Sequence, residues 1–77
     1  MAAAIHIYPN PAKDLCYIQL PEGMQANQLQ VLNSIGQVVH RQTESMERIT
    51  TAQLPGGVYT VILETNCGKA AKKLILE

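Results

Sequence analysis

One stretch decides the fold of this chain: residues 54–63, which read LPGGVYTVIL. Pro55 fixes its own φ, and the two glycines after it accept φ values that other residues avoid, so the chain turns there. The next six residues, 58–63, include five that are β-branched or aromatic, which favours an extended strand. A turn that leads into the longest apolar strand predicts the centre of a small β-domain.

The composition indicates a small domain with a modest core. The chain has 77 residues, which is one domain or a piece of a longer protein. A domain of this size buries only about 60% of the surface of its unfolded chain, so its stability is expected to be modest. Hydrophobic residues make up 47%, and Phe and Trp are absent, so Leu, Ile, Val and Tyr side chains are expected to form the core.

Charge and hydropathy argue against two classes of partner. The six basic and six acidic residues cancel, and a neutral, aromatic-poor chain lacks the basic surface of a nucleic-acid-binding protein. No apolar run approaches the ~20 residues of a membrane-spanning helix. Residues 1–4 are too short and uncharged for a signal peptide. We expect them to be a start residue and spacer of an expressed fragment, or a linker, ahead of one domain over residues 5–77.

Seven short strands separated by turn signals are expected. They cover residues 5–8, 15–20, 28–32, 37–41, a few residues within 43–53, 58–64 and 69–76. Most of them are separated by prolines, at positions 9, 11 and 21, or by glycine-containing stretches, at 33–36 and 65–68. Gly36 is expected in the left-handed conformation of a hairpin loop. This hairpin is the clearest local signal in the chain.

The stretch 43–53 is compatible with two structures. Met46, Ile49 and Ala52 recur every three residues, and Ser45 is a suitable cap, as in a short helix. The β-branched run 49–51 disfavours a helix, so we expect a loop followed by a short strand. The chain is therefore predicted to be all-β, an immunoglobulin-like antiparallel β-sandwich of about seven short strands. The Cys-Trp-Cys signature of immunoglobulin domains is missing.

Alternation along the strands predicts which side chains face the core. The side chains expected inside are Cys16, Ile18, Leu20, Leu29 and Val31, with Tyr17 and Gln19 outside. On the last strand, positions 71, 73 and 75 alternate with 72, 74 and 76. The lysines there suit an edge strand, because charge discourages pairing with another chain.

No catalytic or metal-binding pattern is recognisable. The residues available for a nucleophilic triad are Ser34, Ser45, Cys16, Cys67, His6, His40 and Asp14, and none lies in a context such as a G-x-S-x-G elbow. His6, Cys16, His40 and Cys67 do not have the close pairing of zinc ligands. Gly56 and Gly57 lack the lysine of a phosphate-binding loop. We expect no enzyme, no metal and no cofactor.

The two cysteines allow two interpretations. Cys16 and Cys67 either form a disulfide or remain two separate thiols, and the distance between them cannot be read from the sequence. Because a single pair carries little information about a disulfide framework, separate thiols are preferred.

Three stretches occur in a characteristic order: Y-P-N-P at residues 8–11, LNSIGQVV at 32–39, and LPGGVY at 54–59, followed by Gly68 and the apolar, lysine-bearing strand 72–75. Together they resemble the C-terminal sorting domain of type IX secretion substrates from Bacteroidetes. The resemblance covers residues 5–77. The residues of these motifs expected to be structural are Tyr8, Pro9, Asn10, Pro11, Gly36, Leu54, Pro55, Gly57, Tyr59 and Gly68.

The resemblance implies a role in protein export. Members of the family are seven-stranded immunoglobulin-like sandwiches at the C-terminus of a secreted cargo. The cargo enters the periplasm through a signal peptide, the outer-membrane translocon recognises the sorting domain, and a sortase-like peptidase removes it. The cargo then stays at the cell surface or is released. The implied partners are the translocon and sortase proteins and a cargo domain upstream in the same chain.

The last strand is the expected recognition element. Its residues are Lys72, Lys73, Leu74, Ile75, Leu76 and Glu77. An exposed strand could be recognised by addition to the edge of a receptor sheet. The same edge would allow a homodimer or a strand-swapped dimer of the isolated domain. Lys72 and Lys73 could equally be a solvated strand end, and Glu77 departs from the basic or apolar residue that often ends the family pattern.

Two other functions remain open. A glycan- or protein-binding module of a secreted protein would need exposed aromatic side chains, and only Tyr17 qualifies, since Tyr8 and Tyr59 are expected to be buried or held in the hinge. A purely structural spacer is the second alternative. The proline-rich stretch 9–11 is stiff, which suits a boundary between a cargo and its signal.

Overall fold

The computed structural model describes residues 5–77. The expected spacer or linker, residues 1–4, lies outside the described residues. The described part of the chain has no helix; 58% of it is strand, and its seven antiparallel strands form two sheets. The strands are β1 (His6–Tyr8), β2 (Leu15–Gln19), β3 (Ala26–Leu32), β4 (Val38–Gln42), β5 (Arg48–Thr50), β6 (Gly57–Thr65) and β7 (Gly68–Leu76). The predicted all-β sandwich is confirmed.

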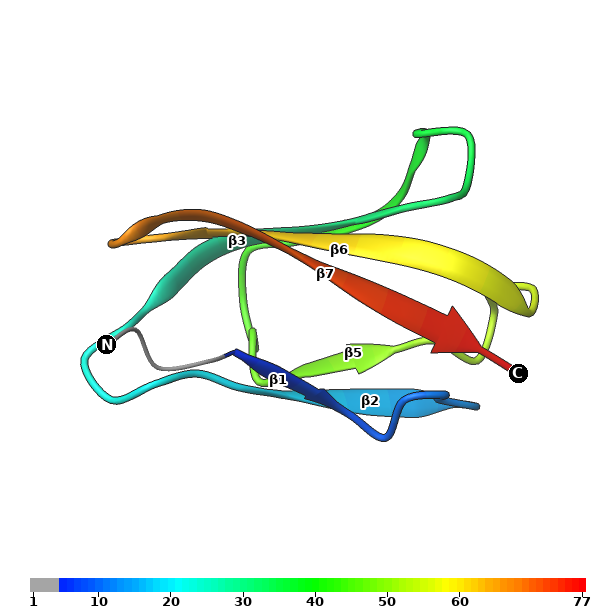
Figure 1. Ribbon diagram of the computed structural model, residues 1–77, viewed down its shortest axis with the longest axis horizontal. Helices are drawn as coiled ribbons and strands as arrows, with labels where there is room; N and C mark the ends of the chain where they lie inside the picture. The colour runs from blue at the N-terminus through cyan, green and yellow to red at the C-terminus, as the bar shows by residue number, and fades with distance from the viewer. Residues whose placement is uncertain (1–4) are drawn as a thin grey trace.

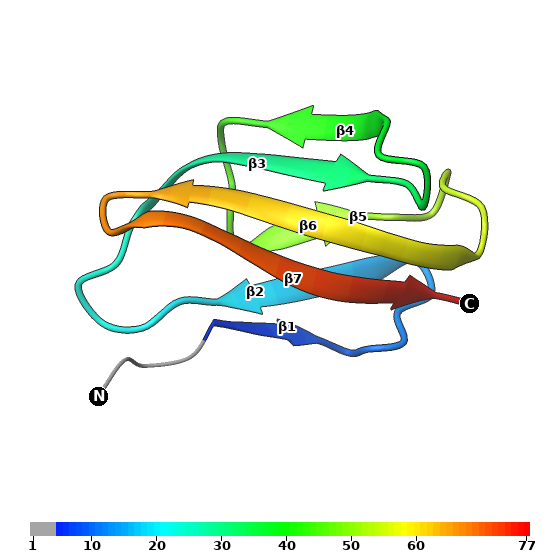
Figure 2. The same ribbon diagram turned by 45° about the horizontal axis from the view of Figure 1, so that its top comes forward.

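The two sheets face each other across the core (Figure 1). The small sheet has the order β1-β2-β5 and the large sheet the order β4-β3-β6-β7. Strand β4 pairs with β3 in the large sheet and does not join β5. In constant-type immunoglobulin domains the fourth strand belongs to the sheet of the first, second and fifth strands, whereas here it belongs to the sheet of β3. Strands β1 and β7 each form an edge of their own sheet and lie on the same side of the sandwich (Figure 2).

The core lies between the sheets, and alternation along the strands fills it. Its buried apolar residues are Ile5, Ala12, Cys16, Ile18, Leu29, Val31, Ile49, Tyr59, Val61, Leu63, Leu74 and Leu76. The predicted inward positions of β2 and β3 are confirmed, except that Leu20 is only half-buried and lies beyond the end of its strand. Leu54 is half-buried and packs against the core from the turn.

The turn at residues 54–57 is held by a tyrosine corner. The hydroxyl of Tyr59 donates a 2.6 Å hydrogen bond to the carbonyl oxygen of Pro55, and the tyrosine ring is buried. A tyrosine at the start of the sixth strand that bonds back to the preceding corner is a hallmark of immunoglobulin-like sandwiches. Gly56 packs against the end of β7, because a Cβ built on it would lie 3.0 Å from the carbonyl carbon of Glu77.

Local structure departs from the sequence prediction in a few places. Strand β3 begins at Ala26, two residues before the predicted start, so the predicted connection is shorter. The helical alternative for 43–53 does not form, and the preferred loop and short strand β5 are confirmed. Gly36 has a φ of +86°, the left-handed conformation expected of it. No helix in the described part of the chain could cross a membrane.

Candidate recognition surface

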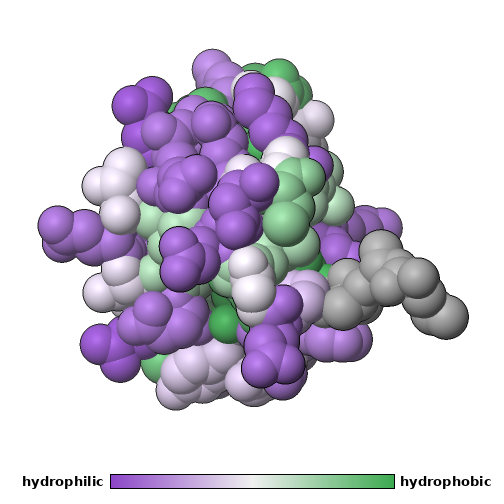
Figure 3. Space-filling view, turned by 90° about the vertical axis from the view of Figure 1, so that its left-hand side faces the viewer, coloured by the Kyte–Doolittle hydropathy of each residue, from purple (hydrophilic) through white to green (hydrophobic). Residues whose placement is uncertain are grey.

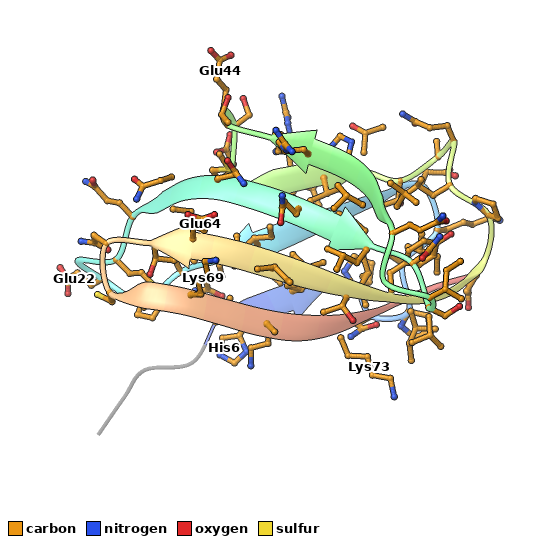
Figure 4. All side chains as sticks on the ribbon, turned by 90° about the horizontal axis from the view of Figure 1, so that it is seen from above. His6, Glu22, Glu44, Glu64, Lys69 and Lys73 are labelled. Atoms are coloured by element: carbon orange, nitrogen blue, oxygen red, sulfur yellow. The ribbon has the colours of Figure 1, made fainter. Side chains whose placement is uncertain are left out.

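Strand β7 is an edge strand of the large sheet, as its lysines predicted. Leu74 and Leu76 are buried in the core, whereas Lys73 and Ile75 are exposed on the opposite face. Lys72 lies on the inward side but is only half-buried. Figure 4 shows Lys69 and Lys73 along this edge of the sandwich. The predicted recognition residues therefore divide into core side chains and exposed side chains.

The C-terminal half of the β7 edge is covered by residues 10–12, which we call the N-terminal clasp. The Asn10 side chain donates through Nδ2 to the carbonyl of Lys73 at 3.2 Å and accepts through Oδ1 from the N–H of Ile75 at 3.0 Å. The N–H of Ala12 donates to the carbonyl of Ile75 at 2.8 Å, and the N–H of Glu77 donates to the carbonyl of Ala12 at 2.9 Å. The clasp thus runs parallel to β7 and bonds to the outward carbonyl of Lys73 and to both outward backbone groups of Ile75.

The composition of the clasp explains its hydrogen-bonding pattern. Pro9 and Pro11 have no backbone N–H, so they cannot donate to β7 as an ordinary strand would. The Asn10 side chain supplies a donor and an acceptor instead, and Ala12 completes the pairing. The peptide bonds before both prolines are cis. Residues 9–11, expected only to be a stiff hinge, carry the chain from the small sheet to the edge of the large one.

The N-terminal half of the β7 edge is open. Ile75 directs its N–H and carbonyl away from β6, and the alternation of an antiparallel strand gives Lys73, Ala71 and Lys69 the same outward direction. The N–H and carbonyl of Ala71 have no hydrogen-bond partner among residues 5–77. An added strand could pair here without displacing anything that the structure describes.

Tyr8 corrects one prediction. It was expected to be buried or held in the hinge, but it is 49% exposed and belongs to β1. Its ring lies beside that of Tyr17, with the centroids 5.8 Å apart. Tyr8 and Tyr17 are register partners across β1 and β2, so both rings lie on the side of the small sheet that points away from the core. Tyr59, the third tyrosine, is buried as expected.

The two cysteines are free and occupy different environments. Cys16 is buried in the small sheet, and Cys67 is exposed in the turn between β6 and β7. Burial raises the pKa of the Cys16 thiol, and a hydrogen bond from the backbone of Ile49 offsets part of that effect. A thiol with a raised pKa is a poor nucleophile, which does not fit Cys16 for catalysis.

The other candidates for chemistry are not brought together. Ser34 lies in the β3–β4 loop. His40 is on β4, where its Nε2 is within hydrogen-bond distance, 2.7 Å, of Oε1 of Gln42. Within residues 5–77, no hydrogen bond joins a histidine to a serine or cysteine, and no His, Cys, Asp and Glu side chains cluster as metal ligands. An open hollow beside the β4–β5 loop is lined by polar residues. Within that loop, the side-chain amide of Gln42 donates to the carbonyls of Glu44, Ser45 and Arg48.

The geometry agrees with a comparison of the sequence with known families. The family model of the secretion system C-terminal sorting domain matches residues 6–77. The chain belongs to this family. The match runs from β1 to the end of β7, so it includes the clasp, the tyrosine corner and both halves of the β7 edge. A comparison with curated proteins finds no match.

Membership gives the sorting domain its general role. The family is the C-terminal sorting signal of type IX secretion, which implies interaction with that secretion machinery and export to the cell surface or the extracellular space. A sorting signal is not itself a catalytic domain. The sequence resemblance is confirmed over nearly the whole chain. Of the surface features, sequence reasoning missed the hydrogen bonds of Asn10, although a single amide side chain between two prolines was a visible signal.

Proposed function

We propose that residues 5–77 direct a cargo upstream in the same chain across the periplasm and through the type IX outer-membrane translocon. A sortase-like peptidase then removes the domain, and the cargo remains at the cell surface or is released. The domain performs no catalysis and uses no cofactor. The observation that carries the proposal is the family match over residues 6–77, together with a folded sandwich that places its C-terminal strand at a sheet edge.

We propose that the translocon recognises residues 72–77 within this folded unit. Lys73 and Ile75 offer exposed side chains, and the adjacent backbone of Ala71 offers an open edge. Addition of a receptor strand would begin at this open half and extend toward Glu77 only if the clasp were displaced. The same edge would pair two copies of the isolated domain in a dimer.

An export assay tests the main proposal. An inert periplasmic protein fused to residues 5–77 is expected at the surface of a type IX-competent cell and absent from the surface of a translocon mutant. Retention of this fusion in the periplasm of the competent cell would refute the proposal. Export in both strains would show that another route carries the fusion.

The recognition step needs variants that keep the core. Deleting residues 72–77 removes the buried Leu74 and Leu76 and would unfold the sandwich. Ala71→Pro removes only an outward N–H, which an edge strand tolerates, and Ala71→Ser is the matched control. We expect the proline variant to lose export and the serine variant to keep it. Equal export of both would rule out strand addition at this point.

A further variant asks whether the signal is the folded domain or a linear segment. Gly57 has a φ of +154°, where a β-branched residue is strained, so Gly57→Val is expected to unfold the domain and abolish export. Export of a variant that circular dichroism shows to be unfolded would identify a linear signal.

The exposed tyrosines favour one alternative, a glycan-binding module. Tyr8 and Tyr17 form a contiguous aromatic surface on the small sheet. Selective binding of the 77-residue chain to a glycan array, lost in Tyr17→Ala, would support that function. Under the sorting proposal, Tyr17→Ala leaves export unchanged.

A further inference from the structure

The outward face of the large sheet carries several apolar side chains on neighbouring strands. Val58 and Ile75 are register partners across β6 and β7, and both are exposed. Thr60, the next outward residue of β6, pairs with Leu32, which in turn pairs with Val38. Side chains opposite each other on one face of a sheet are in contact range. We call the outward side of the large sheet the outer face; its apolar residues are Leu32, Val38, Val58, Ile62, Ala71 and Ile75, with Thr60 between them.

The β3–β4 loop extends this surface upward. In Figure 1 the loop rises above the large sheet, away from the small sheet. It carries Ile35, whose side chain is 76% exposed. Asn33 bridges the loop, because its Oδ1 accepts hydrogen bonds from the N–H groups of Ile35 at 3.1 Å and Gln37 at 2.9 Å. An apolar side chain presented on a pre-organised loop loses little conformational entropy when it is covered.

The exposed large hydrophobic side chains of residues 5–77 form two main groups, one on the outer face and its loop and the other the pair of tyrosines on the small sheet. Ile35, Val38, Val58 and Ile75 are four of these exposed residues, and they come from the outer face and the loop above it. Single exposed apolar residues need no explanation, but a contiguous set marks an interaction site. The end of the sandwich that carries the β6–β7 turn is mostly hydrophilic (Figure 3), so the apolar area does not spread over that end.

The charged groups on the outer face are mainly cationic. Arg41 pairs with Gln30, Lys73 with Thr60, and Lys69 with Glu64, which places all three basic side chains on this face. Glu64 is the one carboxylate among these register partners, and the Gln28 amide donates to it at 3.4 Å. Figure 4 looks onto this face and shows Glu64 and Lys69 near one end of the β6–β7 hairpin. A complementary partner would have carboxylates around an apolar centre.

We infer that the outer face docks a protein of the export machinery whose surface has an aliphatic centre and an acidic rim. This contact rests on the proposed sorting function and differs from strand addition, because it uses side chains of β3, β4, β6 and β7 rather than the backbone edge of β7. A protein fits better than a membrane. Interfacial attachment to lipid uses Trp and other aromatic anchors, but the chain has no Phe or Trp. Its exposed tyrosines lie on the small sheet.

Two double variants of the exported fusion test the inference. Val58→Thr with Ile75→Thr removes apolar surface and keeps β-branched residues, which suit a strand. Arg41→Glu with Lys73→Glu reverses the charge of the rim. The matched controls are Tyr17→Thr, an exposed position on the small sheet, and Lys13→Glu with Arg48→Glu, the same charge change away from the outer face. Urea unfolding of each purified chain establishes that it is folded.

We expect both outer-face variants to lower the exported fraction of the reporter about tenfold, as loss of an interface anchor does, and the controls to export normally. Normal export of both outer-face variants beside a normally exported parent would overturn this inference and leave the sorting function standing. Failure of the parent fusion would overturn both. In a separate arm, the purified 77-residue chain is sedimented with phosphatidylglycerol-containing vesicles. Binding that Val58→Thr with Ile75→Thr abolishes would replace the protein partner by a membrane and overturn the assignment.

Discussion

Asn10 and Ile75 are 65 positions apart in the chain, and the N–H of Ile75 donates a 3.0 Å hydrogen bond to Oδ1 of Asn10. The other end of the same amide donates to the carbonyl of Lys73. One side chain near the start of the domain therefore covers two backbone groups of its last strand. This contact couples the N-terminal segment of the domain to the strand proposed for recognition.

Asn10→Ala is expected to weaken this coupling. The variant loses both side-chain hydrogen bonds but keeps the two backbone bonds of Ala12. Because the site is exposed and water can replace the amide, the free energy of unfolding should fall by only about 1 kcal/mol. The more specific effect is local. Amide hydrogen exchange at Ile75 should become faster, whereas exchange at Leu63 in the core should change only with global stability.

Asn27→Ala is the matched control for Asn10, because Asn27 is exposed on β3 and makes no side-chain hydrogen bond with the described residues. It should leave exchange at Ile75 unchanged. Equal protection of Ile75 in the parent and in Asn10→Ala would contradict the clasp.

Tyr59→Phe tests the tyrosine corner. The substitution keeps the buried ring and removes the hydroxyl that bonds to the Pro55 carbonyl. We expect the free energy of unfolding to fall by about 1–1.5 kcal/mol in urea denaturation. Tyr17→Phe is the control, since Tyr17 is exposed, and it should change stability by less than about 0.5 kcal/mol. Equal effects of the two substitutions would show that the corner does not stabilise the fold.

Leu74→Ala tests the division of β7 into core and exposed side chains. Leu74 is fully buried, so truncation should cost about 2–5 kcal/mol, enough to unfold much of so small a domain. Ile35→Ala removes a side chain that is 76% exposed and should stay within about 0.5 kcal/mol of the parent. Thermal unfolding followed by circular dichroism compares them. A similar loss in both would contradict the burial pattern.

The two thiols should react at different rates. In the folded chain, iodoacetamide should modify Cys67, which is exposed, and spare Cys16, which is buried. Addition of urea should make Cys16 reactive. Mass spectrometry of digested protein reads both sites, and rapid modification of Cys16 without urea would contradict its placement in the core.

Cys16 also predicts a dependence of stability on pH. Burial raises its pKa above the ordinary value of 9.0, so the folded chain keeps a proton that the unfolded chain releases. The contribution is fully present below pH 9.0 and is lost as pH rises from there through the pKa of the folded state. The slope from this thiol can approach about 1.4 kcal/mol per pH unit. In urea unfolding at several pH values above 9.0, the free energy of unfolding of Cys16→Ala should fall less steeply with pH than that of the parent. Identical slopes for the two chains would contradict the raised pKa of Cys16.

The sequence predicted the strands well because their signals are local. Alternation placed Cys16 and Ile18 inward and Tyr17 outward, and Leu29 and Val31 on the core side. Gly36 occupies its left-handed position for the same reason, since one residue's backbone preference is enough to specify it. The motifs at residues 8–11, 32–39 and 54–59 were sufficient for the family.

Tertiary structure decided the features that join distant segments. The exposure of the Tyr8 side chain depends on how β1 pairs with β2. The motif at residues 8–11 carries no information about that pairing. The pairing of β4 with β3 follows from the local hairpin, but the pairing of β3 with β6, which lies about thirty residues further along the chain, does not show in either strand alone.

The edge of β7 shows the same limit at the candidate recognition surface. The sequence by itself determined that residues 69–76 form a lysine-bearing strand, because charge and alternation are properties of that strand alone. Only the closed sandwich decided that residues 10–12 cover one half of its edge and leave Ala71 open. The physical reason is that neither the Asn10 amide nor a backbone group specifies its hydrogen-bond partner in the sequence, so the partner is set by where the two sheets bring the chain together.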